Sequence, residues 1–148
     1  MASQRALILG LGLTCGLAFA TLAVAEDAQT STLTLVATGF DSDDGEALIQ
    51  LANSQADYES DDEGFRVAKI KPVGNKVETT FEDLAYGEYG IKIFHDENGN
   101  GELDIGWTGP EEGYGFSNDA RALMGPPDWE DAKFTVSEPT QAIEIELK

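Results

Sequence analysis

The sequence is poor in the residue types that build most reactive sites. Among its 148 residues there are one cysteine, Cys15, one histidine, His95, and nine Lys and Arg side chains. A zinc or copper site needs several thiolate or imidazole donors, which this chain lacks. The nine basic residues face 28 acidic ones, which disfavours binding to nucleic acids and anionic membranes because phosphates would be repelled. The acidic surface instead favours divalent cations, basic partners or a saline environment.

Long apolar runs are also scarce, and the one present lies near the N-terminus. It extends over 6–25, follows Arg5, and ends in the small-x-small sequence 23–25 before Glu26. A basic start, an apolar centre and such an ending are typical of a secretory signal peptide. We therefore predict export to the periplasm or the exterior, with cleavage after Ala25. The alternative is a retained membrane anchor, because about 20 apolar residues nearly span a bilayer, but the polar residues that follow favour cleavage.

Cleavage would remove 25 of the 148 residues and leave 123, which is the size of one domain. Residues 26–30 form a short polar tail, and 31–148 form the domain. Loss of Arg5 leaves eight basic residues against 28 acidic ones, a formal charge of −20, and loss of Cys15 leaves no thiol. Such a domain has no stable membrane anchor and no disulfide, so it must depend on its hydrophobic core.

Apolar and polar residues alternate through most of this domain, and turn sequences interrupt the alternation roughly every 8–15 residues. This pattern is typical of an all-β protein built from short strands. The polar connection 54–64 is expected to be exposed, with room for one helical turn. We predict a seven-stranded antiparallel β-sandwich with one long ordered loop. The expected strands cover 32–38, 45–53, 65–71, 76–81, 89–95, 132–136 and 142–147.

The long loop follows the fifth expected strand, spans 96–131 and shows little periodicity. Its many glycines and Pro126-Pro127 oppose both helix and strand. It keeps too many large apolar side chains for a disordered segment, so we expect an ordered cap over the sandwich. Most aromatic residues in such a loop anchor the loop itself. The alternative is a platform for a carbohydrate or a cell-envelope protein, and the candidates for that role are Trp107, Tyr114, Phe116 and Asn118.

The most informative part of the loop is 96–104, with the sequence DENGNGELD. A calcium loop of the EF-hand kind places oxygen ligands at relative positions 1, 3, 5, 7 and 9, and a glycine at position 6. Glycine falls at position 6 here, but Trp107 stands at position 12, where a bidentate Glu is expected. We predict a calcium-binding half-motif of weak affinity, with Glu111 or Glu112 closing the shell. The predicted ligands are the side chains of Asp96, Asn98, Asn100 and Asp104 and the carbonyl of Glu102.

The same residues are also compatible with a plain turn that binds no metal. Asn98-Gly99 and Asn100-Gly101 are strong hairpin sequences, because Asn and Gly tolerate positive φ. Leu103, Ile105 and Trp107 then alternate with other residues, as a returning strand would. The Asx side chains would be solvated in that case. Both interpretations place the segment on the surface.

Catalysis is not expected from this set of residues. Nucleophilic catalysis requires a base that a third group orients, and neither a serine elbow nor a second histidine accompanies His95. Carboxylate pairs arise by chance among 28 acidic residues, so they do not indicate a glycosidase. We predict that the protein is not an enzyme and that His95 has a structural role at the end of the fifth strand.

Several segments of the chain resemble known proteins. The stretch 80–89, TFEDLAYGEY, resembles the Leu-x-x-Gly-x-Tyr corner of transthyretin-like and collagen-adhesin B-type sandwiches, in which it opens a core strand. From about 33 to 147 the chain is similar to the bacterial domain of unknown function 2141 family. The resemblance implies an exported β-sandwich of immunoglobulin or transthyretin type with no established activity. The motifs that carry it, in addition to the corner, lie at 95–104, 112–118, 125–127 and 131–136.

Only the 96–104 loop and the 113–118 segment carry over from this resemblance as site elements. After Asp104, Ile105-Gly106-Trp107 replaces a more usual polar stretch, which leaves one oxygen ligand unassigned. The sequence therefore predicts an exported, non-catalytic protein that binds calcium and thereby orders its aromatic-bearing loop. The alternative is a carbohydrate- or protein-binding module with a metal-free acidic turn.

Overall fold

The computed structural model describes residues 29–60 and 64–148, so the predicted signal peptide lies outside the described residues. The described part is mostly β, as expected, and its helices span at most four residues. None of these helices is long and apolar enough to cross a membrane. The helical elements are α1 (Gln55–Tyr58), η1 (Ser117–Asp119) and α2 (Trp129–Ala132). The strands are β1 (Thr30–Thr38), β2 (Glu46–Ala52), β3 (Arg66–Ile70), β4 (Lys76–Ala85), β5 (Gly87–Asp96), β6 (Ile105–Gly106), β7 (Gly109–Pro110), β8 (Tyr114–Phe116), β9 (Phe134–Val136) and β10 (Thr140–Glu146).

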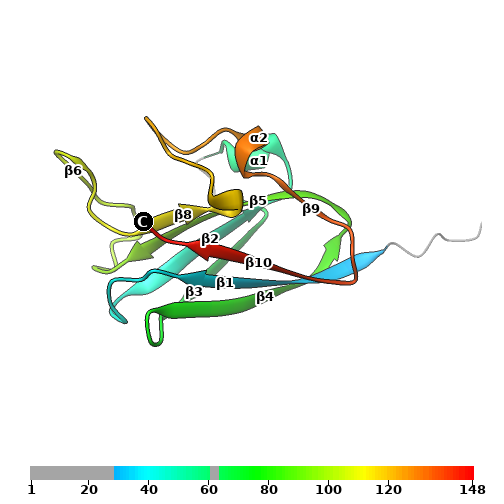
Figure 1. Cartoon of the computed structure of the whole chain (residues 1–148), viewed down its shortest axis with the longest axis horizontal. Helices are drawn as coiled ribbons and strands as arrows, with labels where there is room; N and C mark the ends of the chain where they lie inside the picture. The colour runs from blue at the N-terminus through cyan, green and yellow to red at the C-terminus, as the bar shows by residue number, and fades with distance from the viewer. Residues whose placement is uncertain (1–28, 61–63) are drawn as a thin grey trace, which may run out of the picture.

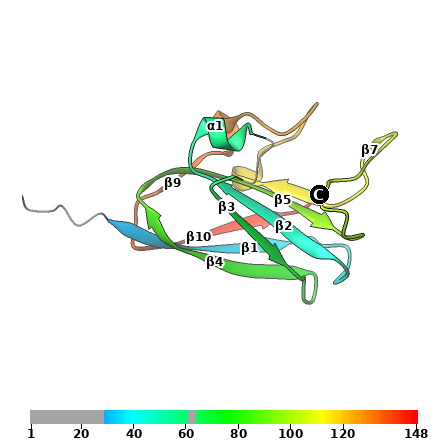
Figure 2. The same ribbon diagram turned by 180° about the vertical axis from the view of Figure 1, so that it is seen from behind.

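Two sheets form the body of the molecule and face each other (Figure 1). The first has the strand order β10-β1-β4, and the second has the order β3-β2-β5-β8, with β9 also pairing with β5. The short strands β6 and β7 form a separate hairpin, which projects from one end of the molecule (Figure 2). Each of the seven expected strands corresponds to one of these ten, and the three additional strands all lie in the long loop.

One pairing differs from the wholly antiparallel arrangement that we expected. β1 and β10 run parallel, with Leu35 opposite Ile143. The reason is the route of the chain before β10, because the Thr32 N–H near the start of β1 donates to the Pro139 carbonyl at 3.0 Å. Both strands therefore start at the same end of the sheet and proceed in the same direction. The pairings of β1 with β4 and of β2 with β3 and β5 are antiparallel.

The core lies between the two sheets and follows from the alternation in the strands. Leu33 and Leu35 of β1 are fully buried, as are Ile49 of β2 and Ile91 of β5, whereas their sequence neighbours in β1 and β2 are partly exposed. Burial of each such side chain contributes about 1.5–3 kcal/mol. At the β4–β5 corner the Tyr89 hydroxyl donates to the Ala85 carbonyl at 2.8 Å, so the predicted corner closes on its own backbone.

A second, smaller cluster lies where the two short helices meet β5. It consists of Ala52, Tyr58, Trp129 and Ala132. Gly90 of β5 permits this packing, because a Cβ at that position would come within 2.9 Å of both Tyr58 and Trp129. The long segment thus leaves β5 at Asp96 and is anchored again on the side of β5 by α2 (Figure 1).

Candidate functional site

Asp96, the last residue of β5, organises the loop that we predicted to bind calcium. Its side chain is only 4% exposed. One carboxylate oxygen accepts the N–H groups of Gly99 at 2.8 Å and Asn100 at 3.1 Å, and the other accepts the N–H of Gly101 at 2.9 Å. Gly99 and Gly101 have φ of 76° and 81°, which is the conformation that favours glycine. The loop is therefore wound around a buried carboxylate.

The two asparagines of the loop continue the same winding. Each Asn uses its Oδ1 atom to accept the N–H two residues further on, at 2.9 Å for Asn98 and 2.8 Å for Asn100. Each also donates an Nδ2–H to Asp104, and the Asn100 contact measures 3.0 Å. The structure thus brings together four of the five predicted ligands. Glu102 is exposed at the outer edge of the loop and donates its N–H to Asn100.

Glu112 closes the base of the loop through hydrogen bonds, while the acid that would complete a calcium shell, Glu111 or Glu112, stays a prediction. It is only 8% exposed, and its two carboxylate oxygens accept the N–H groups of Glu97 at 3.0 Å and Asp104 at 3.1 Å. Glu111 is exposed and lies over Gly106, although its N–H donates to the Asp104 carbonyl at 2.8 Å. Glu112 therefore holds both ends of the 96–104 loop together.

The carboxylates of the loop do not by themselves form a metal centre in this structure. Within residues 29–60 and 64–148, no group of three or more His, Cys, Asp or Glu side chains is arranged to hold a metal ion. A cation at the loop would therefore need the amide and backbone oxygens as well as the carboxylates. Calcium accepts such mixed oxygen ligands, whereas zinc and copper prefer imidazole and thiolate.

His95 lies directly beside the loop but is occupied by packing. It is 1% exposed, its ring meets Phe40 edge to face at 5.1 Å, and its Nε2 lies 2.7 Å from the Asp44 carbonyl. A carbonyl only accepts, so Nε2 carries the proton in this arrangement. Nδ1 lies 3.5 Å from a carboxylate oxygen of Glu97, which also accepts the Ser42 hydroxyl at 2.9 Å. The ring thus ties the 41–45 turn to the start of the loop.

The four candidate ligand-binding residues do not gather at one place. Trp107 is fully exposed at the tip of the β6–β7 hairpin. Tyr114 and Phe116 lie together in β8, with ring centroids 5.9 Å apart. Asn118 donates its amide to the backbone carbonyls of Lys133 at 2.7 Å and Asp131 at 3.3 Å. Only the two β8 aromatics line a common groove.

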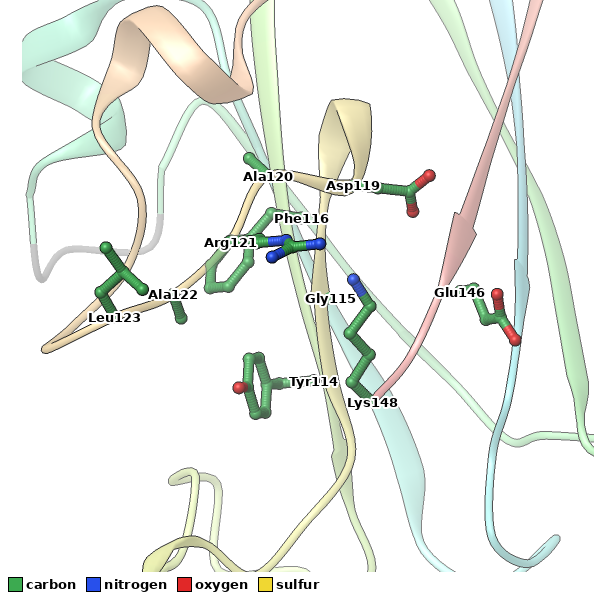
Figure 3. A pocket seen from close by; sticks show the side chains of 10 residues that line it. All are labelled: Tyr114, Gly115, Phe116, Asp119, Ala120, Arg121, Ala122, Leu123, Glu146 and Lys148. Carbon is green, nitrogen blue, oxygen red and sulfur yellow. The ribbon is translucent and has the colours of Figure 1, made fainter.

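Sequence reasoning did not anticipate the other residues of that groove. They include Arg121 and Leu123 of the 119–123 segment and Lys148, which follows β10 and pairs with Tyr114 of β8 (Figure 3). One signal was present in the sequence, because Arg121 is the only Lys or Arg between Lys92 and Lys133. Its proximity to Lys148 depends on the pairing of distant segments, which the sequence does not reveal.

Comparison with known proteins identifies a family but no characterised relative. The family of uncharacterized proteins conserved in bacteria, DUF2141, matches residues 36–144. No curated protein matches the chain, and no solved structure matches it.

Proposed function

The chain belongs to the DUF2141 family, and from this premise we propose that it is an exported, non-catalytic protein that binds calcium in the 96–104 loop. The observation that carries the proposal is the hydrogen-bond network of the loop. Side-chain oxygens of Asp96, Asn98 and Asn100 accept backbone N–H groups of the loop. The two Asn side chains also donate to Asp104. Export rests on the predicted signal peptide over 1–25, with the periplasm or the exterior as the destination.

The oxygen atoms of this network retain capacity for a cation. Each Asn Oδ1 accepts one N–H, and a carbonyl oxygen has two lone pairs. The Asp104 carboxylate faces two amide N–H donors, which a cation would displace. Calcium takes six to eight oxygens in flexible geometry, whereas magnesium requires a tight octahedron. A small loop with amide, carboxylate and carbonyl oxygens therefore suits calcium better.

Calcium would add order to the segment that follows the loop. Asp104 donates its backbone N–H to the Glu112 carboxylate and leads directly into the β6–β7 hairpin. An ion shared by Asp96 and Asp104 would fix the start of this segment relative to β5. We expect a dissociation constant of about 10⁻⁴–10⁻³ M, the range of extracellular calcium modules.

We also infer that the two facing sheets form a sandwich of immunoglobulin or transthyretin type. Two observations support this. The core lies between sheets of three and five strands, and the Tyr89 hydroxyl binds the backbone four residues upstream, as in the tyrosine corner of such domains. No catalytic role is assigned to any residue.

A melting experiment with calcium and with chelator tests the calcium proposal. At a calcium concentration about a hundredfold above the dissociation constant, the gain is roughly 2.7 kcal/mol, or roughly 10 °C in Tm. Asp104→Asn should lose most of this gain while leaving the Tm in chelator nearly unchanged, because the side chain keeps its size. Asp43→Asn is the matched control, since it removes the same charge from another loop and should keep the calcium response. An equal response in Asp104→Asn, or no response in the natural sequence, would exclude the site.

A further inference from the structure

The groove beside β8 combines an apolar wall with two basic side chains, and it shares only Leu103 with the 96–104 loop. We propose that it binds a small amphiphile with a single anionic head and a linear apolar chain. A medium-chain carboxylate is the simplest molecule of this class. The proposal concerns a second site, because none of the five predicted calcium ligands lines the groove.

The groove consists of two adjoining pockets. One has a volume of about 400 Å³ and the other of about 410 Å³, and both are lined by Tyr114, Phe116, Ala122 and Leu123. The four shared residues show that the two pockets adjoin each other along β8. The volume of each lies in the range of small-molecule sites. A linear ligand could lie along β8 with one end in each pocket.

The pocket on the hairpin side is apolar. Ile105 on one rim is 72% exposed, and Leu123 and Met124 on the other are 90% and 104% exposed. Single exposed apolar residues are ordinary, but several that converge on one concave surface mark a binding site. An alkyl chain between the two rims would remove all three side chains from water. The remaining apolar lining comes from Leu103, Pro110 and Pro126.

The pocket at the other end carries the positive charge. Arg121 and Lys148 extend toward each other there (Figure 3). Asp119 and Glu146 line the same pocket, yet within the described part of the chain neither Arg121 nor Lys148 forms an ion pair with any acid. Lys133, by contrast, contacts two glutamates at 3.1 and 2.9 Å.

Two neighbouring cations without a bound acid attract an anionic group. A guanidinium presents parallel N–H donors that match a carboxylate, and an ammonium adds a second charge-assisted contact. The net charge of −19 repels polyanions such as nucleic acids and anionic membrane surfaces at longer range. A single anionic head at the end of an apolar chain meets the two local cations and the apolar wall with the least repulsion. This argument selects a monoanionic amphiphile.

Methionine methyl NMR offers a direct test, because the full chain contains only Met1 and Met124. The protein is labelled at the methionine methyl groups and titrated with decanoate in chelator buffer at neutral pH. Decyltrimethylammonium and decyl maltoside serve as probes with the same alkyl chain and a cationic or neutral head. We expect decanoate to shift the Met124 resonance saturably and both other probes to bind about tenfold or more weakly.

Two variants separate the contributions of head and chain. Arg121→Gln with Lys148→Gln should weaken decanoate binding about tenfold or more, while Lys69→Gln with Lys71→Gln removes the same charge from another region and should leave it unchanged. Leu123→Asn, at an exposed position, should weaken binding of all alkyl probes. An unshifted Met124 resonance, equal binding of the cationic probe, or equal affinity in the Arg121/Lys148 variant would overturn the proposal. Binding seen only with vesicles of anionic phospholipid would also overturn it, in favour of a membrane surface.

Discussion

The two sheets and the segment 96–128 distribute polar and apolar side chains in opposite ways. In the sheets, apolar residues such as Leu35 and Ile91 are fully buried, and the acids are exposed except for Asp96 at the end of β5. In the segment, the carboxylates of Asp96 and Glu112 are buried, whereas Leu123 and Met124 are exposed. The same chain therefore uses two different principles of construction.

This difference separates the part of the chain that forms the core from the part in which we propose binding. Burial of apolar surface is the main favourable term in folding, and the sheets use it fully. The segment is instead held by backbone N–H groups bound to carboxylates, which leaves its large apolar side chains free to contact a ligand. Buried acids beside exposed apolar residues are the features on which both proposed binding sites rest.

The largest difference in the free energy of unfolding is expected when a leucine is replaced by alanine in each region. Leu35→Ala should lower the free energy of unfolding by about 2–5 kcal/mol, because it leaves a cavity between the sheets. Leu123→Ala should change it by no more than about 0.5 kcal/mol, since that side chain is 90% exposed. Urea denaturation of both variants measures the difference.

The same experiment in calcium and in chelator sharpens the comparison. The cost of Leu35→Ala should be equal in the two conditions, because the side chain lies in the core cluster and is not one of the predicted calcium ligands. A cost for Leu123→Ala as large as that for Leu35→Ala would mean that the segment folds by apolar burial after all.

Much of the sheet architecture could be predicted from the sequence, because period-two alternation is a local signal. All seven expected strands have counterparts, and the expected helical turn in 54–64 is α1. β8 was missed because it spans only three residues and is paired by β5 rather than specified by its own pattern. The parallel pairing of β1 with β10 was missed because strand direction depends on the route of the chain, not on local composition.

The candidate site could also be predicted only where its residues follow a local sequence pattern. The spacing of Asp96, Asn98 and Asn100 is local, and the structure brings these residues together with Asp104. The hydrogen bonds of Glu112 to both ends of the loop could not be predicted, because they depend on the path of the backbone after the hairpin. The groove of Arg121 and Lys148 required two segments that are 27 positions apart to meet.

An acid in the sheet region provides a smaller, pH-dependent effect. Asp43 accepts the N–H groups of Asn75 at 2.8 Å and Gly74 at 2.9 Å, and these contacts hold its pKa below the ordinary value of 3.8. A lowered pKa in the folded state means that the stabilisation is present above about pH 4 and is lost as the pH falls through the folded pKa. Asp43→Asn should therefore lower the Tm at pH 6 but have little effect near pH 2.

Thermal melts of both proteins across this range, each in calcium and in chelator, give the measurement. The difference in Tm should shrink toward low pH and should not depend on calcium, since both bonded N–H groups lie in the β3–β4 turn. A difference that grows with acidity would show that the carboxylate binds its partners in the protonated form. A calcium-dependent difference would place Asp43 in the same network as Asp96.

The smallest effect is expected at Tyr58, where the long segment rejoins β5. Its hydroxyl is buried without a hydrogen-bond partner in the described part of the chain, and burial raises its pKa, with the charge of Asp128 adding to the shift. Tyr58→Phe should be neutral or stabilising by about 1 kcal/mol, because it removes an unsatisfied polar group and keeps the ring. Lys92 Nζ lies 4.7 Å above that ring and would keep its contact.

Urea denaturation of Tyr58→Phe and Tyr58→Ala measures the two contributions separately. Tyr58→Phe removes only the hydroxyl, whereas Tyr58→Ala also removes the packing against Trp129. If Tyr58→Phe costs more than about 1 kcal/mol, the hydroxyl must have a partner such as a bound water, and this junction would be held by polar contacts like the loop rather than by packing like the sheets.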